Sequence, residues 1–206
     1  MRPRSRSQAG TSRFSPPSRS ARLGILVSVG QLPSVSAFSL TVRGEELGLP
    51  EVVEIPAEKR QDPIFFRHKG AEIGRDGCRV PLPWTSAKGS YGFSPESSDV
   101  EPHLPPPTFW GEFAADKQDQ EKASTLTLYQ QALKLRSELQ TEESLEWIDL
   151  KQDEVVAFKR PNGWTVVLNF GKESVDVSAL GKLVLASGEL DGGKVPTDTS
   201  VWIKGN

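Results

Sequence analysis

The sequence predicts an α+β chain in which a long loop and one helix precede an antiparallel β-sandwich domain. Three observations support this fold class. Prolines and glycines interrupt the stretch from residue 85 to 110, apolar residues recur with helical spacing from 123 to 139, and short runs of strand-forming residues alternate with turn signals from 141 to 206. We therefore expect loop, helix and sheet in that order along the chain.

The first 43 residues differ in composition from the rest. They contain seven arginines and no Lys, Asp or Glu, whereas the first acid is Glu45 and the first lysine is Lys59. Three interpretations remain open on composition alone. The segment could be an organelle transit peptide, which is Arg-rich, Ser-rich and acid-poor. It could be a disordered basic tail, or the product of a GC-rich coding strand read in the wrong frame.

Two short motifs follow this segment. The motif from Gly44 to Pro50 (GEELGLP) is typical of a turn after a strand. The stretch from Gly74 to Trp84 places Arg75 and Arg79 between glycines and prolines, and such a loop holds side chains in fixed positions. An arginine fork suits recognition of hydroxyls or carboxylates, and an indole offers a flat face to a sugar ring. The alternative interpretation is a surface loop with a buried ion pair.

The loop from residue 85 to 110 is long for a compact domain, and loops of this length are usually functional or disordered. Aromatic side chains argue against disorder because they favour burial. The aromatic residues that support this argument are Trp84, Phe93, Phe109 and Trp110.

The helix predicted from Ala123 to Leu139 has an amphipathic pattern, and Ser124 or Thr125 can cap its start. An isolated amphipathic helix needs a partner surface. The neighbouring stretch offers little that could supply one. The resemblance given below implies that the surface on which this helix and the preceding loop would pack is absent, so we expect both to be poorly anchored. Residues 141–206 alone should then form the compact unit.

The C-terminal part predicts six short strands, which cover residues 145–150, 155–159, 164–170, 174–177, 183–186 and 200–203. Pro161-Asn162-Gly163 predicts a turn between the second and third strands. The residues expected in the core are Phe158, Trp164, Val166, Leu168, Leu183, Leu185 and Trp202.

The sequence gives little support to cysteine-based catalysis, to metal binding or to catalysis by a carboxylate pair. Cys78 with His68 or His103 lacks a third group that would orient a catalytic base, and the same three residues match no closed metal site. Four carboxylates lie near the motifs, but nothing in their spacing selects a nucleophile or an acid. They are Glu45, Glu46, Asp62 and Asp76.

Three blocks occur in order with short gaps: Gly44 to Pro50, Arg60 to Phe66, and Gly74 to Trp84. Together they resemble the C-terminal third of bacterial alpha-glucosidases of glycoside hydrolase family 13. The stretch from Leu128 to Arg136 looks like the last barrel helix of that family, and the closing strands look like its C-terminal domain. The resemblance covers residues 44–206.

The resemblance implies the end of a TIM barrel followed by an all-β domain. Residues 44–140 would supply the end of the eighth strand, the eighth βα loop and the last helix, and residues 141–206 the antiparallel β domain. Arg79 matches the arginine of the family that contacts the non-reducing glucose, and Asp76 would fix its orientation. Glu45 and Glu46 would lie at the barrel rim rather than act as catalysts.

The catalytic carboxylates of this family lie on earlier strands, and we find no match to those strands before Gly44. We therefore interpret residues 1–43 as an out-of-frame or scrambled leader, and the chain as a truncated alpha-glucosidase that is inactive alone. The alternative function is a non-catalytic module that binds a carbohydrate or a partner. A third hypothesis is an imported protein with a transit peptide.

The resemblance also sets expectations for ligands and location. The parent enzyme would act on a glucose-containing oligosaccharide, and a complementing N-terminal barrel fragment would be the protein partner. We expect no catalytic residue in this chain, no cofactor and no metal. The net charge of −2 gives no nucleic-acid signal, no apolar run is long enough to span a membrane, and the single cysteine is compatible with the cytoplasm.

Overall fold

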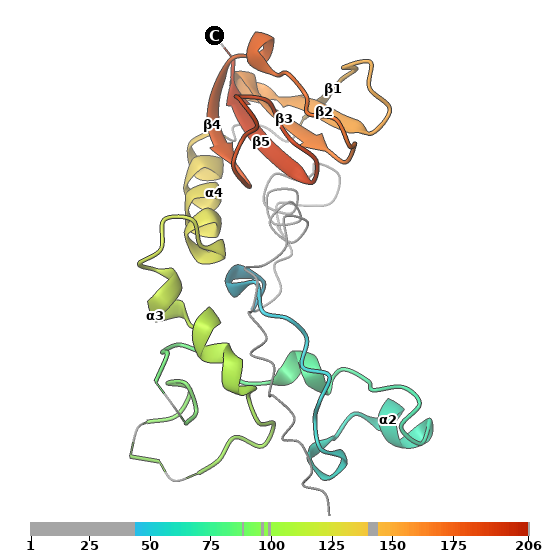
Figure 1. The fold of residues 1–206 in the computed structure, drawn as a ribbon, viewed down its shortest axis with the longest axis vertical. Coiled ribbons are helices and arrows are strands. Elements are labelled where there is room, and N and C mark those ends of the chain that lie inside the picture. Colours follow the sequence, from blue (N-terminus) through green and yellow to red (C-terminus); the bar gives the residue numbers. More distant parts are fainter. Residues whose placement is uncertain (1–43, 88, 96, 99, 140–143, 206) are drawn as a thin grey trace, which may run out of the picture.

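The computed structural model describes residues 44–87, 89–95, 97–98, 100–139 and 144–205. Figure 1 shows a β domain at one end of an elongated molecule, loops with short helices at the other end, and the helix α4 between them. The three interpretations of residues 1–43 lie outside the described residues. The rest of the chain confirms the predicted fold class, in which a loop and a helix precede an antiparallel β domain.

The β domain contains a five-stranded antiparallel sheet with the strand order β1-β2-β3-β5-β4. Its strands are β1 (Glu146–Ile148), β2 (Val155–Arg160), β3 (Trp164–Asn169), β4 (Lys182–Ala186) and β5 (Thr199–Lys204). The predicted turn Pro161–Gly163 joins β2 to β3, and Asn162 adopts a φ of 67° there. β3 is the central strand and all six of its residues are buried, as expected of a strand covered on both faces.

Each face of the sheet has its own apolar layer. Trp164, Val166 and Trp202 face a cluster that includes residues of α4 (Thr125–Leu139). On the opposite face, Val167 and Val201 pack against Val175, Val177 and Val195. The second layer there is built from the loops on either side of β4, in which Val175 and Val195 form an isolated bridge. The predicted strand 174–177 therefore appears as a single bridge in a loop.

Six of the seven predicted core residues are buried, and Leu183 is the exception with 39% of its surface exposed. Leu183 lies on the edge strand β4, where the register shifts between Leu183 and Leu185. A β-bulge of this kind re-aims the side chains around it. The strand pattern alone does not reveal such a shift.

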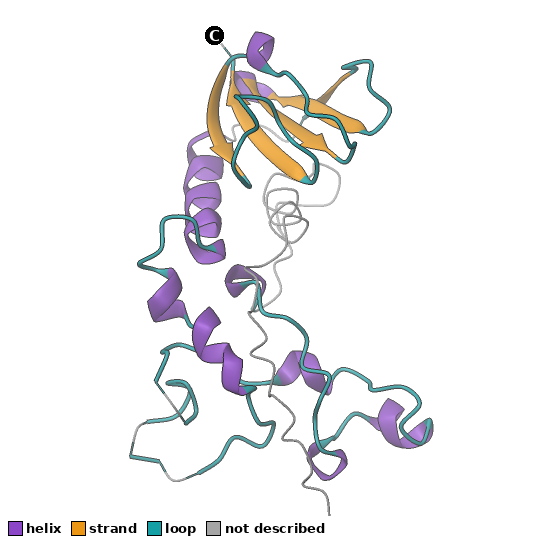
Figure 2. Ribbon diagram, viewed as in Figure 1, coloured by secondary structure: helices purple, strands orange, loops and turns teal. Residues whose placement is uncertain are grey.

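The predicted weak anchoring of the helix is wrong. Leu128, Tyr129, Ala132 and Leu139 of α4 are buried in one cluster with residues of β2, β3, β4 and β5. Ser124 caps the helix as predicted, because its hydroxyl accepts a hydrogen bond of 3.0 Å from the backbone N–H of Thr127. The partner surface of the helix is thus the sheet that follows it in the chain, so the compact unit includes α4 (Figure 2).

The region before α4 consists of short helical turns and loops. These elements are η1 (Glu45–Leu47), η2 (Ala57–Lys59), α2 (Pro63–Arg67), η3 (Asp76–Arg79), η4 (Thr108–Phe113) and α3 (Ala115–Gln118). Val52, Ile55, Val80 and Trp110 form the centre of a third apolar cluster. The long loop is therefore folded around its own core. Of the four aromatic residues expected to be buried there, Trp110 is buried and Phe109 partly so, whereas Trp84 and Phe93 are exposed.

One side chain ties the loop region to α4. The Gln118 side-chain amide donates to the carbonyl oxygen of Leu47 at 2.8 Å, and its oxygen accepts from the N–H of Leu126 at 3.1 Å. Because Gln118 is buried, these bonds are shielded from water. They hold the η1 turn next to the start of the helix.

Candidate functional site

The predicted site residues lie in a loop that is organised by two buried aspartates. Asp62 is the N-cap of α2, and its carboxylate accepts hydrogen bonds from the N–H groups of Ile64 (3.0 Å) and Arg75 (2.9 Å). Asp76 accepts from the N–H groups of Gln61 and Asp62, both at 3.0 Å. The two carboxylates thus join the start of α2 to the η3 turn, although they are fourteen positions apart in the sequence.

Arg79 lies against both carboxylates. Its Nη1 is 3.2 Å from Asp76 Oδ1 and 3.5 Å from Asp62 Oδ2. The aspartates are buried, whereas 47% of the Arg79 side chain remains exposed. The guanidinium is therefore held at one end, and its other donors face solvent, where they are available to a ligand.

The backbone of this loop requires glycine at two positions. Gly74 has a φ of 66°, and a Cβ built on it would lie 2.7 Å from Asp62 Cγ. A Cβ on Gly77 would lie 2.4 Å from the carbonyl oxygen of Val52. Neither distance is compatible with a side chain. The glycines thus allow the backbone to close around the two aspartates.

Both aspartates stay ionised at neutral pH. The N–H groups of Ile64 and Arg75 lower the pKa of Asp62 despite some desolvation, and the charges of Arg79 and Arg75 add to this effect. Burial by itself would raise the pKa of Asp76, but the N–H groups of Asp62 and Gln61 together with Arg79 outweigh burial, so this pKa is lowered as well.

The Gly74–Trp84 loop had two interpretations, ligand recognition and a surface loop with a buried ion pair. The geometry agrees with the second and leaves the first open. A surface loop with a buried ion pair is present, because Arg79 pairs with Asp76 as the resemblance implied. Asp62 was among the candidate carboxylates, but its role as a second partner of Arg79 was not predicted. The Asp62-Pro63 dipeptide carried a signal, since Asp at an N-cap followed by Pro at N1 is a typical helix start.

Other residues of the motifs have different positions. Arg75 contributes its backbone N–H to Asp62, and its side chain is exposed. Trp84 is 52% exposed, so a flat apolar face is available to solvent. Glu46 caps the η1 turn, where its carboxylate accepts from the N–H of Gly44 at 2.9 Å.

Sequence reasoning missed the structural role of Arg60. This buried side chain donates to the carbonyl oxygens of Ile55 (3.1 Å), Ile73 (2.8 Å) and Val53 (2.7 Å). Its guanidinium also lies 4.8 Å from the centre of the Phe65 ring. Arg60 thus connects the segments on both sides of α2.

The aspartate–arginine cluster presents hydrogen-bond donors but no acid–base pair. Glycoside hydrolysis requires a carboxylic acid that is protonated at working pH, which in turn requires a raised pKa. The pKa values of Asp62 and Asp76 are both lowered, and both carboxylates are occupied by backbone donors. Within the described residues, no group of three or more His, Cys, Asp or Glu is placed to hold a metal ion.

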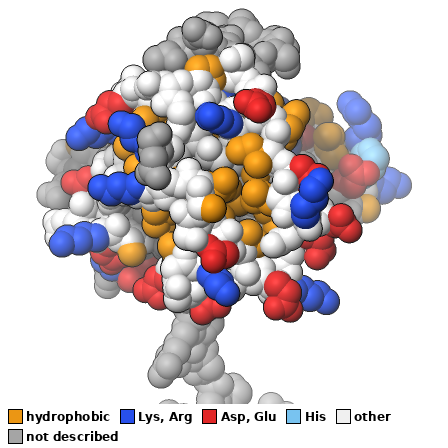
Figure 3. Space-filling view, turned by 90° about the horizontal axis from the view of Figure 1, so that it is seen from above, with side chains coloured by type: hydrophobic (Ala, Val, Ile, Leu, Met, Phe, Trp, Pro, Cys, Tyr) orange, Lys and Arg blue, Asp and Glu red, His pale blue; other side chains and the backbone are white. Residues whose placement is uncertain are grey.

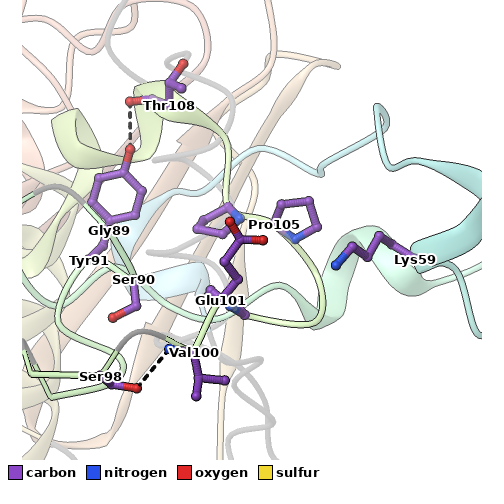
Figure 4. Close-up of a pocket in the computed structure, with 11 residues that line it drawn as sticks. Lys59, Gly89, Ser90, Tyr91, Ser98, Val100, Glu101, Pro105 and Thr108 are labelled. Carbon is purple, nitrogen blue, oxygen red and sulfur yellow. Dashed lines mark hydrogen bonds between the residues drawn. The ribbon is translucent and has the colours of Figure 1, made fainter.

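A separate cavity of about 620 Å³ lies in the long loop. Figure 4 shows Lys59 on one side and Tyr91 on the other, with Glu101 and Pro105 between them. The Tyr91 hydroxyl donates to the carbonyl oxygen of Thr108 at 2.9 Å, which fixes the wall of the cavity. Neither Arg79 nor Asp76 lines this cavity, so it is distinct from the aspartate–arginine cluster.

A comparison with known protein families assigns this chain to one of them. The family described as "Alpha amylase, catalytic domain" matches residues 3–143. This match begins at residue 3, whereas the motifs that carry the resemblance begin at Gly44. No curated protein matches the chain.

Solved structures of whole enzymes share the fold. The alpha-glucosyl transfer enzyme XgtA is 27% identical, with a TM-score of 0.63 over 96% of this chain. Trehalose-6-phosphate hydrolase from Bacillus licheniformis is 19% identical (TM-score 0.65, 89% of this chain), and trehalulose synthase MutB from Pseudomonas mesoacidophila is 18% identical (TM-score 0.66, 90%). The chain spans only 37%, 38% and 38% of the length of these three proteins.

Proposed function

Because the chain belongs to the alpha-amylase family, we propose that it is the C-terminal part of an alpha-glucosidase-type enzyme, with one wall of a glucose site but without the catalytic carboxylates. The observation that carries this proposal is the Arg79 guanidinium, which two buried carboxylates hold while its remaining donors face solvent. Arg79 would donate to the hydroxyls of a terminal glucose, and Asp76 would set its orientation.

The proposed parent reaction is retaining hydrolysis of terminal α-linked glucose from maltose and related oligosaccharides. XgtA, a glucosyl transfer enzyme, supports a substrate with an α-linked glucosyl group. This reaction needs a nucleophile and an acid on either side of the bond. The lowered pKa values of Asp62 and Asp76 exclude them as the acid. As nucleophiles they are unsuited because backbone N–H groups and Arg79 already occupy both carboxylates.

The chain should therefore not hydrolyse α-glucosides by itself. Incubation of the purified protein with 4-nitrophenyl α-glucoside should release no nitrophenol above the rate of the buffer. Nitrophenol release that is lost when a carboxylate of this chain is substituted would overturn the proposal. If a barrel fragment with the missing carboxylates restores turnover when it is added, the complementing partner is identified.

A second candidate function, a non-catalytic sugar-binding module, is favoured by the same guanidinium. Arg79 is held in place before any ligand arrives, which lowers the cost of binding. Calorimetric titration with maltose should give heat that Arg79→Ala abolishes. Arg75→Ala is the matched control, since Arg75 lies four positions earlier and has no carboxylate within ion-pair distance in the described structure. Equal loss in both variants would contradict a specific role for Arg79.

The proposal also covers the cellular location of the protein. None of the helices in the described part of the chain is long and apolar enough to cross a membrane. We assign the protein to the cytoplasm, where its single thiol would stay reduced. Fractionation of cells that produce the chain tests this assignment.

A further inference from the structure

The helix α2 and the turn that follows it form an exposed tip, residues 63–72, which we call the α2 tip. No residue of α2 is buried, and Ile64 and Phe66 keep 37% and 57% of their surface exposed. Arg67 and Lys69 are exposed beside them and form no ion pair in the described structure. Figure 1 shows α2 projecting from one side of the loop region.

The base of the α2 tip is fixed. The Asp62 carboxylate accepts from the first turn of α2, and the Phe65 ring lies 4.8 Å from the Arg60 guanidinium. The Phe66 ring packs edge-on against Phe65, with 5.4 Å between the ring centres. An ordered support presents Phe66 to solvent, which lowers the entropic cost of binding through this side chain.

The cavity of about 620 Å³ in the long loop is a concave counterpart to this tip. Tyr91, Val100 and Pro105 give it apolar walls. An apolar cavity of about 150 Å³ already holds a benzene ring, so this cavity has room for a phenyl group and its neighbours. Lys59 and Glu101 also line it, and neither forms an ion pair in the part of the chain that the structure describes.

The charges of the two surfaces are reciprocal. The α2 tip carries two bases, Arg67 and Lys69, and one acid, Glu72, whose side chain is 58% exposed. The cavity carries one acid, Glu101, and one base, Lys59. Opposite charges around an apolar contact steer two surfaces together and fix their register. The same chain thus holds an apolar projection and a cavity that matches it in shape and charge.

We propose that this chain associates head to tail, with the α2 tip of one copy seated in the long-loop cavity of the next copy. Phe66 fills the apolar part of the cavity, and Arg67 and Lys69 pair with Glu101. Because the contact joins two different surfaces, it closes into a ring or continues into a longer assembly. Neither surface contains Arg79, so the inference is independent of the proposed function.

Sedimentation velocity of the full chain measures this association. The average sedimentation coefficient should rise with protein concentration, because a contact through one aromatic side chain and its flanking charges is small and weak. Phe66→Ala should weaken the association about tenfold or more, since an aromatic anchor is lost. Phe170→Ala is the matched control, because Phe170 is similarly exposed (50%) but lies in the β domain, and it should associate as the unmodified chain does.

A mixture of two variants tests the head-to-tail arrangement itself. Phe66→Ala leaves the cavity intact, and Glu101→Lys leaves the tip intact; both side chains are exposed, so neither substitution removes part of a core. Each variant alone should stay monomeric at concentrations where the unmodified chain associates. An equal mixture should form a one-to-one dimer that grows no further, because only one working tip and one working cavity remain.

Three outcomes would overturn this proposal. The unmodified chain could stay monomeric at every concentration, or it could associate as strongly after Phe66→Ala, which would assign the contact to another surface. The mixed variants could fail to form a dimer, which would show that tip and cavity do not meet. Association that begins only after cleavage of residues 1–43 would likewise assign the cavity to that segment of the chain instead of to a second copy.

Discussion

At the scale of single residues, the site depends on Asp62 and Asp76, which convert a Gly- and Pro-rich loop into a fixed support for Arg79. The resemblance of the sequence motif to a family predicted Arg79 and Asp76 as site residues. It could not identify Asp62 as the second partner, because the contact joins residues from separate motifs. Contacts of this kind follow from the path of the backbone, and in this loop Gly74 and Gly77 determine that path.

The lowered pKa values predict a pH dependence of the Arg79 loop. A carboxylate whose folded-state pKa is depressed contributes stability above its unfolded pKa, and this contribution is lost as pH falls through the folded pKa. The loop should therefore be stable at about pH 7 and loosen below about pH 4. Hydrogen exchange of the Gln61 and Asp62 amides, corrected for the intrinsic rate, should accelerate in that acidic range.

Asp76→Asn should make this exchange fast already at about pH 7, since the charged acceptor and the Arg79 pair are both lost. Asp153→Asn is the control, because Asp153 is exposed and outside the loop. Slow exchange at acidic pH in the unmodified chain would contradict the assigned role of the two carboxylates.

Gly74→Ala should destabilise the chain by more than a left-handed alanine alone costs, which is about 1–2 kcal/mol. The additional cost arises because the new Cβ would overlap the Asp62 side chain. Gly192→Ala is the matched control, since Gly192 also has a positive φ but no atom within 4 Å of the added Cβ. Chemical denaturation of both variants measures the difference, and equal destabilisation would contradict a steric role for Gly74.

At the scale of elements, the sequence-based prediction was wrong about the surroundings of α4. Its period and its cap were predictable because they are local. Its partner surface is the sheet from β2 to β5, which exists only after strands far apart in the sequence have paired. The same limit explains Leu183, which the alternating pattern placed inside and the β-bulge leaves exposed.

Leu128→Ala should lower the free energy of unfolding of the β domain by about 2–5 kcal/mol, because a buried leucine between helix and sheet is lost. Leu133→Ala, on the same helix but 45% exposed, should change it by less than about 0.5 kcal/mol. Urea denaturation followed by tryptophan fluorescence, to which the buried Trp164 and Trp202 of the sheet contribute, measures the change. Equal effects would show that α4 does not support the β domain.

At the scale of the whole molecule, two regions have separate apolar cores. One core lies in the loop region around Trp110, and the others lie on the two faces of the sheet. In the view onto the end of the molecule that holds the sheet, hydrophobic side chains gather near the centre and charged side chains surround them (Figure 3). The family match covers residues 3–143, so the loop region belongs to the catalytic domain of the family.

Limited proteolysis should separate these regions in a defined order. Cleavage should remove residues 1–43 first, and the protected C-terminal fragment should begin before Thr125 because α4 packs on the sheet. Mass spectrometry of the fragments gives the boundaries. A stable fragment that begins near residue 144 would contradict the assignment of α4 to the β domain.

The central claim is that this chain holds a sugar-contacting arginine but no nucleophile of its own. The most direct test is incubation with 5-fluoro-α-glucosyl fluoride, which leaves a long-lived glycosyl group on the nucleophilic carboxylate of a retaining enzyme. Intact mass spectrometry should show the unmodified chain after prolonged incubation. An adduct of one fluorosugar on any carboxylate of residues 1–206 would contradict the claim.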